Sequence, residues 1–149
     1  MAKINLFKKI KEKIKALTTA HGKNELSVED MKWNTTWDRW SRGEVESPYG
    51  ELMTYQSEVY NGGTAQFFDN VSGTGDLEGT LRELYTVLPE PLCLALREAY
   101  TVFLIHGECK TDEDVEALDP VCDACDTAFY EAEEEINEIL RRFSESQPI

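Results

Sequence analysis

The stretch YNGGTAQFFDN, residues 60–70, decides how the chain is expected to fold. Its Asn-Gly-Gly step at positions 61–63 contains two adjacent glycines, which enter φ > 0 regions that residues with side chains avoid. A helix that approaches from the N-terminal side is therefore expected to end here. Thr64 can cap a new turn in which Phe67 and Phe68 face inward. The stretch thus predicts two helices joined by a sharp corner.

The polar residues of this stretch favour a structural function for the corner. The amides of Gln66 and Asn70 are expected to bond the exposed backbone of the turn. An anion-binding glycine loop is the functional alternative for Gly62 and Gly63. Neither the glycine spacing nor the lysine of a nucleotide-binding loop is present, and no strand precedes the glycines. We therefore expect a structural corner.

Periodic apolar residues predict helices along most of the remaining chain. Two helices are expected over residues 27–39 and 76–88. Residues 91–105 are apolar around most of a helical circumference, which predicts the central helix. A short helix is expected over residues 112–118, and a last long helix over residues 119–143 is expected to begin at its Asp-Pro pair. No segment shows the sustained alternation of apolar and polar residues that is typical of a strand. The pattern therefore predicts an all-α fold, a single compact domain of about six to eight helices.

Charge divides the chain into two parts. Residues 1–23 carry seven lysines and one acid, whereas residues 24–149 carry 28 acids and eight bases. The first part is expected to form a basic amphipathic helix and a connector, because its apolar residues recur at steps of three and four: Ile4, Phe7, Ile10, Ile14 and Leu17. We favour packing of this stripe on the acidic helical domain of residues 24–149. The alternative is adsorption to an anionic membrane surface or capture of a partner.

The chain has no apolar run long enough to cross a bilayer and no apolar core of a signal peptide, so a cytoplasmic location is expected. Its cysteines are then expected to be reduced. A structural zinc site is one alternative, since His106-x-x-Cys109 and Cys122-x-x-Cys125 have suitable ligand types and spacing. We favour core packing for Cys122 and Cys125, which lie on the apolar seam of the last helix, and expect no metal or other cofactor.

The aromatic and histidine residues form no recognisable active site. Trp33, Trp37 and Trp40 fall on one helical stripe. In so acidic a chain this stripe favours packing in the core or at a homodimer interface over stacking on nucleic acid. The chain has two histidines, and neither joins a serine or cysteine in a recognisable catalytic pattern. We therefore expect a protein without enzymatic activity.

Acidic residues concentrate toward the C-terminus, where residues 108–138 contain thirteen acids and one base. Residues 131–138 place five carboxylates within about 12 Å of an expected continuous helix, about 2.4 Å per charge, against about 1.7 Å in duplex DNA. The alternative is a solvated acidic face without a partner. The candidate partner-binding residues are Asp112, Glu113, Asp114, Glu116, Glu131, Glu134, Glu135 and Glu138.

The run EVYNGGTAQFFDN, with a Gly/Asp-rich loop after it and a closing helix that reads AFYEAEEEINEIL, resembles a bacterial family of unknown function best known through a DNA-mimic protein. The resemblance is to the C-terminal domain of that protein and covers residues 53–142. Family positions are matched by Asn61, Gly62, Gly63, Gln66, Phe67 and Asn70. Thr64 and Ala65 stand where a bulky residue and an acid are expected. The resemblance implies an acidic, all-helical protein, and the best-known member occupies the DNA-binding surface of a transcription regulator.

Two functions follow as hypotheses. In the first, the chain is a protein-binding module that presents carboxylates to a basic partner, such as a DNA-binding transcription regulator. Nucleic acid itself is not an expected partner, because an acidic surface repels phosphates. In the second, the chain is a structural or adaptor protein whose acidity serves solubility, and its N-terminal helix is a candidate contact with a membrane surface.

Overall fold

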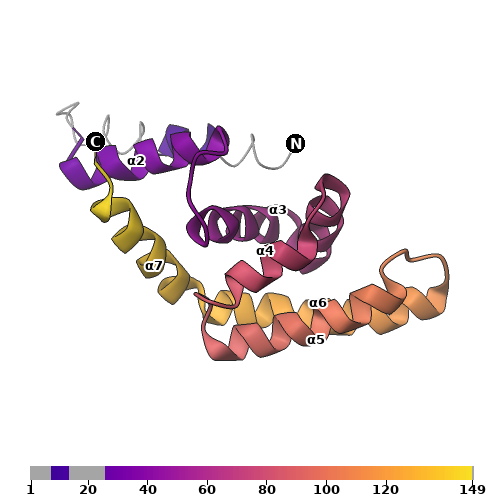
Figure 1. Ribbon diagram of the computed structural model, residues 1–149. Helices are drawn as coiled ribbons and strands as arrows, with labels where there is room; N and C mark the ends of the chain where they lie inside the picture. The colour runs from indigo at the N-terminus through magenta and orange to yellow at the C-terminus, as the bar shows by residue number, and fades with distance from the viewer. Residues whose placement is uncertain (1–7, 14–25, 149) are drawn as a thin grey trace.

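The computed structural model describes residues 8–13 and 26–148, and every regular element in this part is a helix. Residues 8–13 are helical. The helices that follow them are α2 (Val28–Ser41), α3 (Tyr49–Thr74), α4 (Leu77–Leu84), α5 (Glu90–His106), α6 (Asp112–Glu131) and α7 (Glu133–Ser146) (Figure 1). The expectation of an all-α fold in a single compact domain is confirmed.

Side-chain caps begin three of these helices. Ser27, Asp76 and Thr111 each accept a hydrogen bond from the backbone N–H three residues further on, at 3.1, 2.8 and 3.2 Å. At the third cap, the Asp114 carboxylate also accepts from the Thr111 N–H, which makes a reciprocal capping box. Each cap satisfies a donor that the first turn of a helix leaves unpaired, so these short polar residues set where the helices begin.

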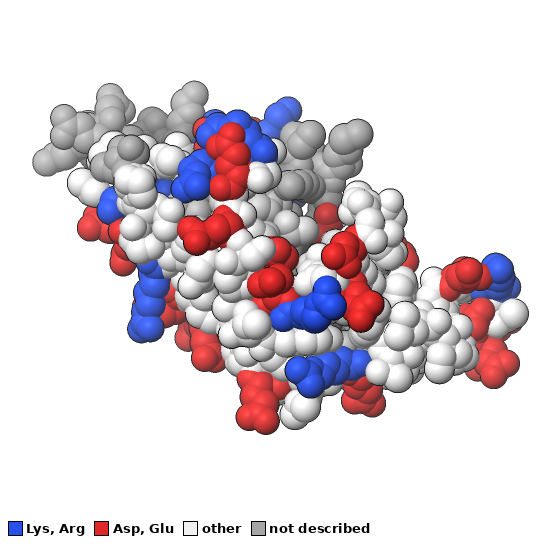
Figure 2. Space-filling model, in the orientation of Figure 1, with Lys and Arg blue, Asp and Glu red and all other residues white. Residues whose placement is uncertain are grey.

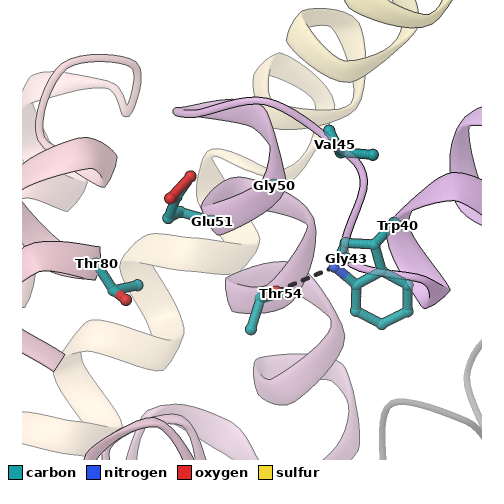
Figure 3. Close-up of a pocket in the computed structure, with 7 residues that line it drawn as sticks. All are labelled: Trp40, Gly43, Val45, Gly50, Glu51, Thr54 and Thr80. Atoms are coloured by element: carbon teal, nitrogen blue, oxygen red, sulfur yellow. Dashed lines mark hydrogen bonds between the residues drawn. The ribbon is translucent and has the colours of Figure 1, made fainter. Parts of the chain in front are cut away.

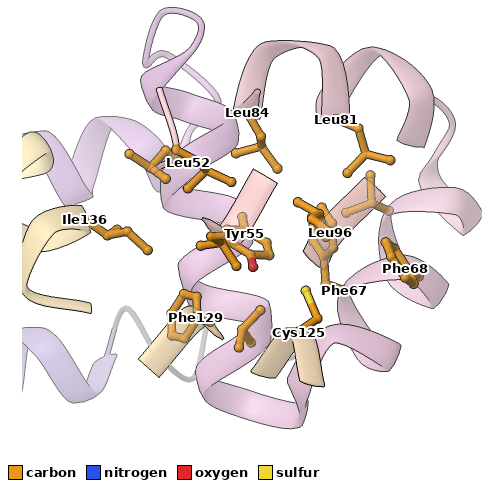
Figure 4. Close-up of a cluster of buried hydrophobic side chains, with 14 of the residues drawn as sticks. Leu52, Tyr55, Phe67, Phe68, Leu81, Leu84, Leu96, Cys125, Phe129 and Ile136 are labelled. Atoms are coloured by element: carbon orange, nitrogen blue, oxygen red, sulfur yellow. The ribbon is translucent and has the colours of Figure 1, made fainter. Parts of the chain in front are cut away.

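The core forms around α3, against which α4, α6 and α7 pack. Leu52, Tyr55 and Phe67 of α3 are fully buried, and they meet Leu96 of α5 and Phe129 of α6 in one apolar cluster (Figure 4). The Tyr55 ring lies edge-on to the rings of Phe67 and Phe129, with centroids 4.9 and 5.5 Å apart. The inward orientation expected for Phe67 is thus confirmed, and α3 is the central helix.

The expectation that residues 91–105 form the central helix is wrong. In Figure 1, α5 runs alongside α6 at the edge of the domain. Its Leu92 and Leu96 are buried, whereas Leu104 and Ile105 are 66% and 73% exposed. An edge helix has neighbours on one side, so an apolar circumference does not guarantee burial on every side.

Trp37 and Trp40 of α2 lie in the core, as expected, and the partly buried Trp33 packs against it. Trp37 and Trp40 are 1% and 2% exposed. The end of α7 returns to cover this helix, where Thr36 donates a hydrogen bond to the Ser144 hydroxyl at 3.2 Å. Lys32 donates to the backbone carbonyl of Glu145 at 2.8 Å. These contacts join the first long helix of the described part to the last one.

The boundary between the C-terminal helices lies at a residue that the sequence did not predict, although α6 begins at Asp112 as expected. Pro120 lies inside α6, which runs from Asp112 without interruption, so no new helix starts at residue 119. The chain instead breaks at Ala132, with φ −95° and ψ 1°, and α7 begins at Glu133. Proline removes a backbone donor from a helix and crowds the preceding turn. The long packing contact between α5 and α6 outweighs that local penalty.

Only residues 8–13 of the expected N-terminal helix are described. Ile10 packs against the core, and the Lys11 ammonium lies 3.7 Å from the Asp38 carboxylate. In this short piece the apolar side therefore meets the domain and a lysine meets an acid. The rest of the expected helix and its connector lie outside the described residues. Among the described residues, no helix has the length and apolar character needed to cross a membrane.

Candidate partner-binding surface

The Asn-Gly-Gly corner is made by Gly63. The chain of α3 is helical before and after this residue, whose φ of 80° and ψ of −177° redirect the backbone. That combination of angles is essentially open to glycine alone. The expected arrangement of helix, corner and helix is therefore confirmed, although both halves belong to one element, α3.

Asp126 of α6 caps the second half of α3. Its Oδ1 accepts a hydrogen bond from the Thr64 N–H at 2.7 Å and another from the Thr64 hydroxyl. The expectation that Thr64 caps this turn is wrong, because the cap comes from another helix. A Cβ atom at Gly63 would lie 2.8 Å from the Asp126 Oδ2, so the glycine also leaves room for the carboxylate.

The two amide side chains of the stretch, Gln66 and Asn70, hydrogen-bond a buried carboxylate. The expectation that Gln66 and Asn70 bond the backbone of the turn is wrong. Both donate to Oε2 of Glu58, at 3.0 and 2.7 Å. Glu58 is 7% exposed, and a buried carboxylate needs such donors. The corner is therefore a polar structural unit.

Two hydrogen bonds attach the start of α7 to α3. The Tyr60 hydroxyl donates to the Glu133 carboxylate at 2.7 Å, and the Gln56 amide donates to the Asn137 side chain at 2.7 Å. Burial, together with the hydrogen bond to Glu133, raises the pKa of Tyr60. Glu133 is thus engaged by the domain itself.

The structure separates the candidate acids into two groups. Four lie in the first turns of α6, and the others lie at its end and on α7. The 20 residues of α6 span about 30 Å at about 1.5 Å per residue, so the two groups do not form one patch.

Asp114, one of the candidate acids, is bonded within the domain. Its Oδ1 lies 2.8 Å from the His106 Nδ1, and its Oδ2 accepts from the backbone N–H of Lys110 at 3.0 Å. The hydrogen bond with His106 is the main cause that lowers the pKa of Asp114. This carboxylate closes the loop between α5 and α6.

The expectation of one continuous acidic helix over residues 131–138 is wrong. Glu131 is the last residue of α6, while Glu134 and Glu135 lie in the first turn of α7. The spacing of about 2.4 Å per charge therefore does not hold, since it assumed one helix. Carboxylates in a first turn are stabilised by the positive end of the helix dipole. Glu138 forms an exposed ion pair with Arg142 at 2.8 Å.

The unbroken course of α6 reveals an acidic stripe, defined here as Asp112, Glu116, Asp119 and Asp123. All four side chains are exposed, and none forms an ion pair with a described residue. Their spacing of four, three and four residues places them on one helix face over about 16 Å. Asp119 and Asp123 were missed because the sequence was divided at Pro120. The same spacing would have found them in a helix read through the proline.

The charge of α6 is unusually uniform. The helix carries eight acids and no lysine or arginine. By contrast, acidic and basic side chains are mixed on the face shown in Figure 2, where α5 passes in front of α6. Two of the α6 acids, Asp114 and Asp126, bond within the domain, and the other six are exposed.

The residues of the zinc alternative do not come together. Cys122 and Cys125 are buried in the core, whereas Cys109 is exposed and His106 contacts Asp114. Burial raises the pKa of Cys122 to about 12 and that of Cys125 to about 11, which disfavours the thiolate that binds metal. Within residues 8–13 and 26–148, no group of three suitable side chains forms a metal site.

The fold and surface define an acidic, all-helical domain with a glycine corner in its central helix and an exposed acidic face on α6. The profile of the DMP19-like protein family matches residues 49–147, about two thirds of the chain, and the chain belongs to this family. The matched region extends from the first residue of α3 to just beyond α7, so it includes both the corner and the acidic stripe. Neither a curated protein nor a solved structure matches the chain.

Proposed function

We propose that the protein is a non-enzymatic protein-binding module that acts in the cytoplasm and uses the outer face of α6 to engage a basic surface of a DNA-binding protein. The observation that carries the proposal is the acidic stripe. It presents four carboxylates in line, without a cation on the same helix.

The energetics of α6 support a use for these charges. Like charges along one helix repel one another, and among the described residues no cation neutralises the stripe. A basic partner relieves that repulsion and is steered toward the face by its field. The same field disfavours direct binding of DNA or RNA.

The spacing of carboxylates along the stripe can be compared with the spacing of phosphates along DNA. One carboxylate per helical turn gives a spacing of about 5.4 Å, against about 3.4 Å per phosphate along one DNA strand. The stripe therefore offers a partner fewer charges per length than a DNA strand does. Glu113 and Glu131 of α6 are exposed carboxylates outside the stripe, and further acids lie in the first turn of α7.

The test compares two variants with the same change in net charge. The stripe variant carries Asp112→Asn, Glu116→Gln, Asp119→Asn and Asp123→Asn. The control variant replaces four exposed acids on other helices with glutamine: Glu29, Glu78, Glu90 and Glu98. A protein captured from native lysate at low salt is identified, and its affinity for each purified variant is then measured.

We expect the affinity of wild type to fall steeply between about 50 and 200 mM salt. The stripe variant should bind at least about tenfold more weakly at low salt, whereas the control should stay within about threefold of wild type. Equal losses in both variants would show that net charge alone matters. Affinity that does not respond to salt would also contradict the proposal.

A second variant tests the α7 end of the surface, with Glu131, Glu134, Glu135 and Glu138 changed to glutamine. Removing these charges relieves repulsion, but Glu134 and Glu135 also lose their favourable interaction with the start of α7. We therefore expect the melting temperature to change little. A loss of affinity comparable to that of the stripe variant would extend the binding surface to α7.

The membrane-adaptor hypothesis is checked by sedimentation with anionic liposomes, for the full chain and for a chain without residues 1–20. Retention that depends on these residues, with no protein captured by the stripe, would favour the adaptor.

A further inference from the structure

A pocket of about 190 Å³ opens between the end of α2, the α2–α3 loop, the start of α3 and α4. It is distinct from the acidic stripe on α6. Trp40, Glu51, Thr54 and Thr80 are among the side chains that line it (Figure 3). Figure 3 shows the Glu51 carboxylate on the same side of α3 as Thr80, with the indole of Trp40 beyond Thr54. The pocket is smaller than the roughly 300–1,000 Å³ of small-molecule sites, which suits a single side chain.

Glu51 provides the first indication of the ligand. Its Oε2 accepts a hydrogen bond from the Ser47 hydroxyl at 2.8 Å. Its Oε1 is buried and has no hydrogen-bond partner among the described residues. Buried carboxylate oxygens are normally paired, because an unpaired one loses its hydration without replacement. An unpaired oxygen on a side chain that lines a pocket favours a ligand that donates a hydrogen bond to that carboxylate.

The other lining groups favour the same kind of ligand, because three of their donors are already used. The Trp40 indole N–H donates to the Thr54 hydroxyl oxygen at 3.0 Å, and the Thr80 hydroxyl donates to the Asp76 carbonyl at 2.8 Å. The backbone N–H of Gly50 donates to the Glu46 carbonyl at 2.9 Å. The oxygens of Thr54 and Thr80 can still accept. The pocket therefore offers acceptors to a ligand and few donors.

The charge of the α2–α3 loop and the start of α3 favours a cation. Residues 43–54 contain three glutamates and no lysine, arginine or histidine. The nearest arginine in sequence, Arg42, is held by Asp38 at 2.8 Å and by Glu44 at 3.2 Å. Guanidinium and ammonium groups carry donors only and a positive charge, and the planar guanidinium also packs well on an aromatic wall such as Trp40.

We infer that this pocket takes the guanidinium of an arginine side chain from a basic partner, with Glu51 as its anion. This assignment rests on the proposed function, since it supplies that partner with a specific anchor in addition to the diffuse charge of α6. Arginine is favoured over lysine because its planar fork of donors can bond several acceptors at once, and the pocket offers both a carboxylate and threonine oxygens.

The experiment titrates the full chain with ethylguanidinium and follows backbone amides and the Trp40 indole N–H by NMR at constant ionic strength. N-ethylurea, a neutral molecule of similar shape, is the control probe. We expect saturable shifts at Trp40, Glu51 and Thr54 with ethylguanidinium, and at least tenfold weaker binding of N-ethylurea. Equal binding of the two probes, or shifts confined to other regions, would overturn the assignment.

Matched variants test the anchor residue. Glu51→Gln should weaken ethylguanidinium binding at least fivefold, whereas Glu46→Gln, an exposed change in the same loop, should leave it within twofold of wild type. Unchanged binding in Glu51→Gln would contradict the role of the carboxylate. Melting curves show whether each variant is folded. If Glu51→Gln does not fold, the comparison of the two probes on the wild-type protein still decides the question.

A blocked arginine separates the two sources of a guanidinium. N-acetyl-arginine methylamide, which imitates an arginine within a chain, should bind at least as tightly as ethylguanidinium. Its exclusion would show that the pocket takes a free small cation, and the partner side chain would be the wrong ligand. None of these measurements involves α6. The pocket assignment and the proposed role of the stripe can therefore fail independently.

Discussion

Replacing Gly63 by alanine tests the corner in α3 directly. The glycine has φ 80° and ψ −177°, a region in which a residue with a side chain is strained by about 1–3 kcal/mol. The new Cβ would also lie 2.8 Å from the Asp126 Oδ2. Displacing that carboxylate weakens the cap on the Thr64 N–H, and a helix cap contributes about 0.5–2 kcal/mol. Together these effects predict a loss of about 2–5 kcal/mol of stability.

The assay is thermal unfolding followed by circular dichroism, with chemical denaturation as a second measure. In a domain of this size, 1 kcal/mol corresponds to about 2–4 °C, so Gly63→Ala should lower the melting temperature by about 10 °C. Gly73→Ala is the matched control. Gly73 lies within α3 at an ordinary φ, and a Cβ there would meet no atom within 4 Å, so alanine should stabilise by about 0.5–1 kcal/mol. Similar melting temperatures for the two variants would refute the conformational argument.

Three further predictions concern single side chains. Asp126→Asn keeps the shape of the cap on Thr64 but removes its charge, and should lower stability by about 1–2 kcal/mol in denaturant titrations. The hydrogen bond with His106 lowers the pKa of Asp114 in the folded protein. The stabilisation that this carboxylate contributes is therefore present above its unfolded pKa of about 3.9, and it is lost as the pH falls through the lower folded pKa. The difference in melting temperature between wild type and Asp114→Asn should therefore be large at pH 6 and shrink toward pH 2; a constant difference would contradict this. At pH 8, a thiol reagent should modify Cys109 alone in the native chain and all four cysteines after unfolding, and Cys109→Ser should abolish the native reaction.

Local chemistry determined much of the fold in advance. The caps at Ser27, Asp76 and Thr111 act within one turn, so their positions in the sequence suffice to place three helix starts. The break at Gly63 is equally local, because the ability to adopt φ > 0 is a property of glycine itself. The uniform negative charge of residues 112–131 likewise needs no structure to be seen.

Tertiary contacts decided the features that involve distant residues. Neither the cap on Thr64 nor the partner of Asp114 can be read from neighbours in sequence, because Asp126 and His106 lie on other helices. Pro120 reads locally as a helix boundary, yet α6 passes through it because packing against α5 stabilises the helix on both sides. That contact aligns Asp119 and Asp123 with the earlier acids of α6. The sequence alone therefore determined that this region is acidic, while packing determined which of its acids share one exposed face.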